Sequence, residues 1–529
     1  MHTSRHALRP LLTALLAAGL PLGAAFAQGT PAPAAPAAVA EPTLDIRGFK
    51  IDGDNPLSEA QTGAVLAPFT GDKRGLSQIE AAATALERAI RAEGFVFHRV
   101  FVPVQKPVDG QISLQILRFT LDQVTMSGNE KFSTENIRRS LPALVEGKAP
   151  DIYEIGRDLT AANANPAKQV QVTFRESAKP DAVDAVLRVK DTDPLAYFVN
   201  YTTNYSVRPR APNDNVHRLT AGLQHANLFD RDHVGALTYT TDPNRIRSVT
   251  LFGAYYQMPI YGTGINLSAY LNSSDVNSGQ VAGGIDVSGQ GQFMGVRATL
   301  ALERRGKLQQ TVGLALDRRY FENNSTFNGA RILPNVGSMP LSVRYTARQE
   351  ETWGTVGGSI DLVTNLGFGR GNSGQSYAAN GGTRTWNALR YAVDGNYRIN
   401  EWTLTGRWRG QFSGNALIAG EQFGLGGVGS VRGFADRVVA GDRGYSVNLE
   451  AQGPEMFFPQ FRPLFFLDTG RVHSRTASVT EDLLSVGVGL RWSSPHVDVS
   501  ADLGKVLSAQ IGELRNNPVR LHVALTYRF

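Results

Sequence analysis

From residue 195 to residue 529 the sequence alternates apolar with polar residues and shows no helical periodicity. The pattern is clearest at the end of the chain, where every second residue is apolar or aromatic and the residues between them are mainly polar. The apolar set is Leu521, Val523, Leu525, Tyr527 and Phe529. Alternation with a period of two is typical of β-strands whose two faces meet different surroundings. This part of the chain is therefore predicted to form an antiparallel β-structure.

The first residues predict export from the cytoplasm. Residues 1–27 have a basic start, an apolar run from Leu11 to Leu22 and the small-residue sequence Ala25-Phe26-Ala27, which is the pattern of a signal peptide. The apolar run is too short for a helix that spans a bilayer. A soluble antiparallel sheet could alternate in the same way. A long series of such strands in an exported chain nevertheless favours a transmembrane β-barrel, in which alternate residues face lipid and lumen.

Two repeated units precede the predicted barrel. Residues 28–43 are rich in proline and alanine and are expected to be an extended tether. Residues 44–118 and 119–194 then each show a strand, two helices and two strands in that order, with Gly53 and Gly128 at equivalent turns. We interpret them as two small α+β domains, each within the size range that folds alone.

One glycine-rich segment lies between two of the predicted strands. Eight glycines occur from Gly420 to Gly444, and they surround the sequence Val431-Arg432-Gly433-Phe434. Glycine at this density lets a loop fold tightly and approach other groups closely. We therefore expect a loop that folds back into the barrel and places Arg432 for a specific contact.

The neighbouring strands contain partners for Arg432. By the alternation, Phe466 and Asp468 point into the lumen, and so does Glu450 of the preceding strand. A guanidinium binds a carboxylate in bidentate geometry, so Arg432 is predicted to pair with Asp468. In a water-filled lumen this pair is screened, and its loss is expected to cost only about 1 kcal/mol or somewhat more. The predicted role is positional.

The residues give no sign of covalent chemistry, of a metal site or of a cofactor. The chain lacks cysteine, its nine histidines are scattered, and no G-x-S-x-G sequence lies in a strand-turn-helix context. Residues 367–371, Gly-Phe-Gly-Arg-Gly, are not followed by a predicted helix, so we interpret them as a mobile extracellular loop and not as a phosphate-binding loop. The net charge of +6 is spread along the chain and does not indicate nucleic-acid binding. We predict that the protein is not an enzyme.

The motifs resemble those of two-partner secretion outer-membrane transporters, the haemolysin and filamentous-haemagglutinin secretion and activation proteins. Val431 to Phe434 resemble the Val-Arg-Gly-Phe/Tyr loop of this family, and residues 466–470, which end in Gly470, resemble its Phe-x-Asp-x-Gly strand. The last residues, Tyr527 and Phe529, resemble the C-terminal assembly signal of bacterial outer-membrane barrels.

The two α+β domains also resemble modules of this family, the POTRA (polypeptide-transport-associated) domains. In the first domain the matching residues are Pro103, Gln105, Asp109 and Gly110. In the second domain the matching sequence is Asn165-Pro166.

The resemblance implies a fold and a location for the mature chain. The fold is two α+β POTRA domains (β-α-α-β-β), residues 44–118 and 119–194, followed by an antiparallel transmembrane β-barrel of about sixteen strands over residues 195–529. The location is the bacterial outer membrane, with the POTRA domains in the periplasm.

The resemblance also implies a function and partners. The protein is expected to capture a secreted exoprotein with an N-terminal secretion domain, an adhesin or a haemolysin, and to conduct it unfolded through the barrel to the cell surface. Outer-membrane lipid and the barrel-assembly machinery are the other expected partners. A barrel-assembly insertase remains an alternative, although insertases usually have more soluble domains. A passive porin is disfavoured because it needs no POTRA pair.

The chain departs from the family pattern in two places. Some members close the barrel with an N-terminal helix, whereas residues 28–42 are too rich in proline for such a plug. In the sequence Asn227-Leu228-Phe229-Asp230, Asp230 stands where the family often has glycine. We therefore expect this turn to be built differently.

Overall fold

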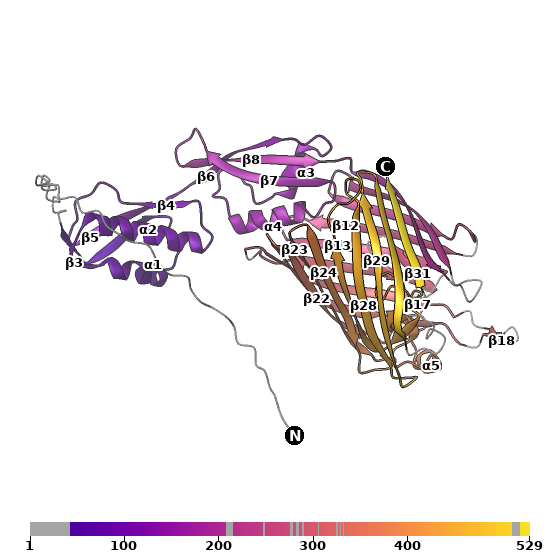
Figure 1. Cartoon of the computed structure of the whole chain (residues 1–529). Coiled ribbons are helices and arrows are strands. Elements are labelled where there is room, and N and C mark those ends of the chain that lie inside the picture. The colour runs from indigo at the N-terminus through magenta and orange to yellow at the C-terminus, as the bar shows by residue number, and fades with distance from the viewer. Residues whose placement is uncertain are drawn as a thin grey trace, which may run out of the picture.

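The computed structural model describes residues 43–529 except for short gaps at 208–214, 247–248, 276–278, 282–284, 288–289, 305, 324–325, 328–329, 332 and 510–518. The predicted signal peptide, almost all of the predicted tether and any N-terminal plug lie outside the described residues. Two small α+β units and one large barrel follow each other along the chain (Figure 1). Among the described residues, no helix is both long and apolar enough to cross a membrane.

The first α+β unit is a three-stranded sheet covered by two helices. Its elements are β1 (Leu44–Ile46), β2 (Gly48–Gly53), α1 (Glu59–Leu66), η1 (Ala67–Phe69), β3 (Gly71–Arg74), α2 (Leu76–Ala92), β4 (His98–Phe101) and β5 (Gln111–Arg118). The sheet order is β2-β5-β4, with β2 parallel to β5, and β1 pairs separately with β3. Ser58 and Gln61 form a capping box at the start of α1. The apolar face of α2, which includes Leu86 and Ile90, packs on the inner face of the sheet.

The second α+β unit repeats this arrangement. Its elements are β6 (Thr120–Ser127), α3 (Thr134–Ser140), α4 (Ile152–Ala162), β7 (Lys168–Glu176) and β8 (Ala182–Asp191). The sheet order is β6-β8-β7, and β6 is again parallel to the central strand. The predicted order of strand, helix, helix, strand, strand is therefore confirmed in the second unit, and the first unit adds to it the short pair β1 and β3, with β3 between its two helices.

The rest of the chain is a closed antiparallel barrel. Its strands are β9 (Leu195–Ser206), β10 (Val216–Leu228), β11 (His233–Thr241), β12 (Thr250–Ile260), β13 (Ile265–Ser274), β16 (Gly291–Ala301), β17 (Leu308–Phe321), β20 (Val336–Ser338) with β21 (Pro340–Glu351), β22 (Gly354–Asn365), β23 (Asn387–Ile399), β24 (Trp402–Phe412), β27 (Arg443–Gln452), β28 (Arg462–Ser474), β29 (Val479–Ser493), β30 (Val497–Ala509) and β31 (Val519–Arg528). Counting β20 and β21 as one interrupted strand, the described residues form the sixteen strands that were predicted. The last strand, β31, pairs with the first, β9, so the sheet has no open edge.

The shorter elements lie in the connections between barrel strands. They are the hairpins β14 (Gly279–Val281) with β15 (Ile285–Val287), β18 (Thr326–Phe327) with β19 (Ala330–Arg331), and β25 (Phe423–Leu425) with β26 (Val439–Gly441), and the helices α5 (Gly374–Ala379) and η2 (Ala419–Glu421). The second α+β unit lies at one end of the barrel, which we call the proximal end, and α5 lies at the opposite, distal end (Figure 1).

The barrel wall has an apolar outer face and a polar inner face. On β28, the outward Phe465 is 50% exposed, whereas the inward Phe466 is 5% exposed and Asp468 is fully buried. Outward tryptophans and tyrosines such as Trp402 and Tyr397 lie near the proximal turns. An apolar belt with aromatic residues at its border is the surface that a lipid bilayer requires of a barrel.

Candidate functional site

The glycine-rich loop predicted to enter the barrel does fold into the lumen. It comprises residues 413–442, between β24 and β27, and we call it the luminal strap. Leu425, Val431 and Phe434 of the strap are buried against Val472 and other apolar residues of the inner wall. Apolar side chains between Leu425 and Phe434 therefore fix this part of the strap to one side of the lumen.

Arg432, near the tip of the strap, pairs with Asp468 of β28. Its Nε lies 2.7 Å from Oδ2 and its Nη2 lies 2.8 Å from Oδ1, so the contact is bidentate. The backbone N–H of Arg432 also donates to Asp468 Oδ2, at 3.1 Å. Asn448 of β27 donates to the other carboxylate oxygen at 2.8 Å. Asp468 thus binds the side chain and the main chain of the strap at the same time.

Two further carboxylates and an aromatic ring surround the same guanidinium. Nη1 of Arg432 lies 2.8 Å from Glu450 Oε1 and 3.4 Å from Asp502 Oδ2. The guanidinium carbon lies 3.6 Å from the centre of the Phe466 ring, within the range of a cation–π contact. The structure therefore brings together Arg432, Glu450, Phe466 and Asp468, as the strand alternation predicted. Asp502 was not identified from the sequence.

The expectation of a solvated, screened ion pair is wrong. The side chain of Arg432 is 3% exposed and that of Asp468 is fully buried, because the strap and the Phe466 ring cover them. Removing one partner of a buried pair leaves an uncompensated charge, which costs about 3–5 kcal/mol. The sequence-based estimate of about 1 kcal/mol is therefore too low for this site.

The glycines of the motif allow close contact between the strap and the wall. Gly433 has φ +89°, a conformation that favours glycine, and a Cβ there would lie 3.2 Å from the backbone of Gly504 on β30. Its N–H donates to Nε2 of His522 on β31 at 3.1 Å. Gly470 of β28 lies against Leu425 of the strap. Contacts to β28, β30 and β31 therefore converge on the tip of the strap.

The predicted motif of the first α+β unit lies away from the lumen. The side-chain amide of Gln105 accepts from the backbone N–H of Ser113 and donates to its carbonyl, both at 2.7 Å, and so binds β5 as a short strand would. Pro103 lies in the same segment, and its carbonyl accepts a longer contact of 3.4 Å from Gln105. Asp109 and Gly110 form the following turn, with φ of 52° and 74°. These four residues fix the segment between β4 and β5.

The C-terminal residues lie at the seam of the barrel. Tyr527 pairs with Val199 of β9, and the N–H of Phe529 donates to the carbonyl of Tyr197 at 3.1 Å. The rings of Tyr527 and Phe529 stand edge to face with their centres 4.7 Å apart, and both are exposed on the outer face. Both rings therefore face the surroundings of the barrel at its proximal border.

A polar contact between the second α+β unit and the barrel was not predicted from the sequence. Lys168 of β7 is completely buried, and its Nζ lies 2.7 Å from Oδ2 of Asp232 in the turn between β10 and β11. Nζ also donates to Asn136 Oδ1 at 2.8 Å. The hydroxyl of Tyr261, in the next proximal turn, donates to the same oxygen of Asp232 at 2.9 Å. We call the contacts among Asn136, Lys168, Asp232 and Tyr261, together with those of the turn at residues 227–230, the docking contact.

The unusual turn at residues 227–230 belongs to the docking contact. Asn136 donates to Asn227 Oδ1 at 3.2 Å and to the carbonyl of Asp230 at 3.0 Å, and the Ser133 hydroxyl donates to the Asp230 carboxylate. Asp230 has φ 54°, where a glycine would be unstrained. Asn165 donates to the carbonyl of Ala226 at 2.7 Å. A glycine at position 230 would adopt this φ without strain, but it could not form the hydrogen bond that the Asp230 carboxylate accepts from Ser133 of the second α+β unit.

The segment at residues 367–371, expected to be a mobile loop, is folded. It belongs to the connection between β22 and β23 at the distal end, residues 366–386, which we call the cap. Asn372 is buried and donates to the carbonyls of Leu366 and Phe368. Helix α5 follows directly, and its Tyr377 is buried in an apolar cluster with Trp386. The cap therefore packs against the inner wall and against Ile418 of the strap.

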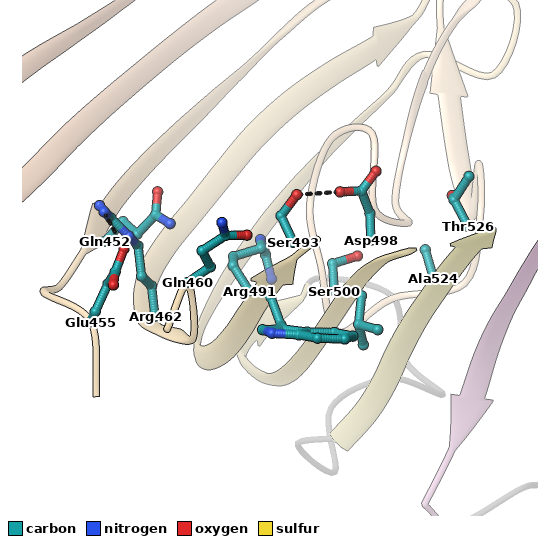
Figure 2. Close-up of a pocket in the computed structure, with 12 residues that line it drawn as sticks. Gln452, Glu455, Gln460, Arg462, Arg491, Ser493, Asp498, Ser500, Ala524 and Thr526 are labelled. Carbon is teal, nitrogen blue, oxygen red and sulfur yellow. Dashed lines mark hydrogen bonds and ion pairs between the residues drawn. The ribbon is translucent and has the colours of Figure 1, made fainter. Parts of the chain in front are cut away.

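A cavity of about 500 Å³, lined mainly by polar residues, lies at the proximal mouth of the barrel. Figure 2 shows its lining, in which Ser493 donates to Asp498 and Arg491 and Ser500 lie on neighbouring strands. Arg491 pairs with Asp502 at 2.6 Å, and Asp502 is also a partner of Arg432. The cavity is therefore connected with the Arg432 cluster through one shared carboxylate. In the described part of the chain, no group of three metal-ligating side chains is close enough to hold an ion.

Comparison with known proteins gives consistent matches. Residues 212–492 match the haemolysin secretion/activation protein family ShlB/FhaC/HecB, and residues 44–118 match the ShlB-type POTRA domain. The outer membrane transporter CdiB of Dickeya dadantii (strain 3937) is 22% identical over 495 residues, which cover 87% of this chain and 82% of that protein.

Solved structures share the fold. CdiB from Escherichia coli matches with a TM-score of 0.76 at 17% identity, over 94% of this chain and 93% of the other. CdiB from Acinetobacter baumannii matches with a TM-score of 0.71 at 16% identity, over 92% of this chain and 90% of the other.

Proposed function

We propose, from the premise that this chain belongs to the haemolysin secretion/activation protein family ShlB/FhaC/HecB, that it captures one secreted exoprotein and conducts it unfolded to the cell surface. Membership makes the chain a two-partner secretion transporter of the outer membrane, with its POTRA domains in the periplasm. The proximal end of the barrel is therefore the periplasmic end. We propose that the exoprotein is an adhesin or a haemolysin with an N-terminal secretion domain.

The observation that carries the proposal is the continuity of polar surface from the periplasmic mouth to the strap. The cavity of Figure 2 opens at the end that holds the POTRA domains, and Asp502 connects its lining with Arg432. An unfolded chain exposes its backbone groups and needs a path that hydrogen-bonds them. Because both acidic and basic side chains line this path, it suits an exoprotein whose charge varies along its sequence.

Capture is proposed to occur on the POTRA sheets. The outer strands β4 and β7 each pair on one side only within their three-stranded sheets. An extended segment can add to such an edge through main-chain hydrogen bonds. Because the second POTRA domain is held on the barrel by the docking contact, a segment bound there lies close to the periplasmic mouth.

The strap is proposed to act as a movable barrier that Arg432 holds in place. Its ion pairs link it to the wall by side-chain contacts, which can break and re-form without unfolding a barrel strand. Since the periplasm has no ATP, the drive for passage is proposed to come from folding of the exoprotein outside the cell. Outer-membrane lipid and the barrel-assembly machinery are the further partners that we propose.

A deletion tests this function. Cells are given the transporter together with an epitope-tagged exoprotein of the two-partner type, and surface export is measured for the intact transporter and for a variant without residues 44–118. We expect export to be lost while the variant barrel remains in the outer membrane and keeps its heat-dependent gel mobility. Unimpaired export of the tagged exoprotein would refute the proposed capture step. A general fall in other outer-membrane barrels would instead favour the insertase alternative.

A further inference from the structure

The luminal strap makes a second buried ionic contact, near the extracellular end of the barrel and away from Arg432. The side chain of Glu421 is fully buried, and its Oε2 lies 2.8 Å from Nη1 of Arg319 and 3.0 Å from Nη2 of Arg390. The hydroxyl of Ser338 donates to Oε1 at 2.6 Å. A carboxylate with two guanidinium partners and a hydroxyl donor is well satisfied in a buried place.

The two ionic contacts of the strap lie on different parts of the wall. Glu421 is bound by strands β17, β20 and β23, whereas Arg432 is bound by β27, β28 and β30. Their charges are also opposite, because an acidic strap residue meets a basic wall and a basic strap residue meets an acidic wall. The strap is therefore held at two places on the wall. Neither charged strap residue could bind at the site of the other, because it would meet its own charge there.

Glu421 also adjoins the apolar cluster at the extracellular end. Ile418 of the strap is buried together with Trp386 of the cap, and both belong to a cluster that includes Phe321 of the inner wall. Gly420 lies so close to Phe321 that a Cβ would be 2.0 Å from its ring. A displacement of Glu421 would therefore separate the strap from this cluster.

We propose that Glu421 is a positioning residue that keeps the strap and the apolar cluster in the closed arrangement at the extracellular end. The inference rests on the proposed function in one respect, because a chain that leaves through the lumen must displace this cluster. Without the carboxylate, Arg390 loses its acidic partner and faces the like charge of Arg319. Arg319 keeps Asp317 at 2.8 Å. The two guanidinium groups are only partly buried, but without a carboxylate between them they repel, and the strap no longer bridges them.

The test is ion conductance of the purified full-length protein in planar lipid bilayers, in potassium chloride, with no exoprotein present. Glu421→Gln keeps the shape of the side chain and removes its charge. We expect the open fraction to rise at least about tenfold, since tenfold corresponds to the loss of about 1.4 kcal/mol of closing free energy. Arg390→Gln should raise it by a smaller factor, because Glu421 keeps Arg319 and Ser338, and the double variant should not exceed Glu421→Gln, which already removes the ion pair with Arg390.

Asp394→Asn is the matched control, because it removes a carboxylate from the inward face of the same strand as Arg390 at an exposed position. Its conductance should equal that of the unaltered protein. An unchanged open fraction in Glu421→Gln, or an equal rise in Asp394→Asn, would overturn the inference. Should Glu421→Gln not assemble, Ser338→Ala removes only the hydroxyl donor and should raise the open fraction by a smaller factor; no rise there overturns the inference as well. Because no exoprotein is present, the conductance result does not depend on the proposed secretion function. A failure of that function would be seen in the export assay instead.

Discussion

The Nζ of Lys168, in the second POTRA domain, lies 2.7 Å from Oδ2 of Asp232, in a periplasmic turn of the barrel, and both side chains are buried. A charged lysine with no exposed surface is costly unless it is paired. Burial lowers the pKa of Lys168, and Asp232 acts in the opposite direction. The pair thus holds two domains at a fixed relative position, and the orientation of the POTRA domain towards the lumen is part of the folded structure.

Replacing Lys168 by Met should loosen this docking while leaving both domains folded. The change keeps the apolar stem and leaves Asp232 buried without its cation, at a cost of about 3–5 kcal/mol. Limited proteolysis should cut between residues 191 and 195 much faster than in the unaltered protein, while the barrel keeps its heat-dependent gel mobility. Lys190→Met, at an exposed position of the neighbouring strand β8, is the control and should behave like the unaltered protein. Equal cleavage of all three proteins would contradict the role given to the docking contact.

Replacing Arg432 should lower export by displacing the strap. Arg432→Ala leaves Asp468 and Glu450 without their shared cation, and Arg432→Lys cannot restore the bidentate geometry. We expect strongly reduced export in both variants with normal amounts of inserted barrel, measured by surface detection of a tagged exoprotein. Normal export in Arg432→Ala would refute the positional role of Arg432.

Exchange of the charges, Arg432→Asp with Asp468→Arg, should not restore export. The guanidinium also contacts Glu450 at 2.8 Å and Asp502 at 3.4 Å, so an acidic side chain at position 432 would face two remaining carboxylates. Recovery of export in the exchanged protein would indicate that Asp468 alone matters.

The first POTRA domain should lose stability in mild acid because of His98. This side chain is buried on β4, and burial lowers its pKa below the ordinary value of about 6.5. Below about pH 6.5 the unfolded state binds a proton that the folded state does not bind, so the free energy of unfolding falls as the pH decreases towards the lowered pKa. Above about pH 6.5 both states are neutral and this contribution is constant.

Hydrogen exchange of residues 44–118 in the full-length protein measures this effect. The β5 amides should exchange faster at pH 5 than at pH 7, after correction for intrinsic rates. In His98→Gln the corrected difference should be smaller. An equal difference in the two proteins would assign the acid sensitivity to another group.

How far the sequence predicts the structure depends on what each pattern encodes. Alternation tells which face of a strand a residue occupies, and it placed Glu450 and Asp468 in the lumen correctly. Alternation does not fix the depth at which strands distant in sequence meet, because register is set by turns and side-chain packing. Asp502 and His522, on the last two strands, were therefore not assigned to the Arg432 cluster.

The sequence also does not predict the burial of two charged residues outside the Val-Arg-Gly-Phe motif, and the reason is physical. Lysine and glutamate are rarely buried, so Lys168 and Glu421 carried no signal of burial in a single sequence. Only the folded chain brings Asp232 to the first and Arg319 to the second. Solvent screening of the Arg432 ion pair is weaker than the sequence predicts, because residues of the strap exclude water from the pair.

Cross-linking of an exoprotein halted during passage tests the central claim most directly. The chain has no cysteine, so single cysteines can be placed on β30 at Ser500, which lines the lumen, or at Leu503, which lies on the outer face. The exoprotein carries one cysteine and a C-terminal fusion to a stably folded domain, which stops it within the barrel. We predict a disulfide-linked product from Ser500→Cys and none from Leu503→Cys. Equal products from both positions, or none from Ser500→Cys while export proceeds, would contradict conduction through the barrel.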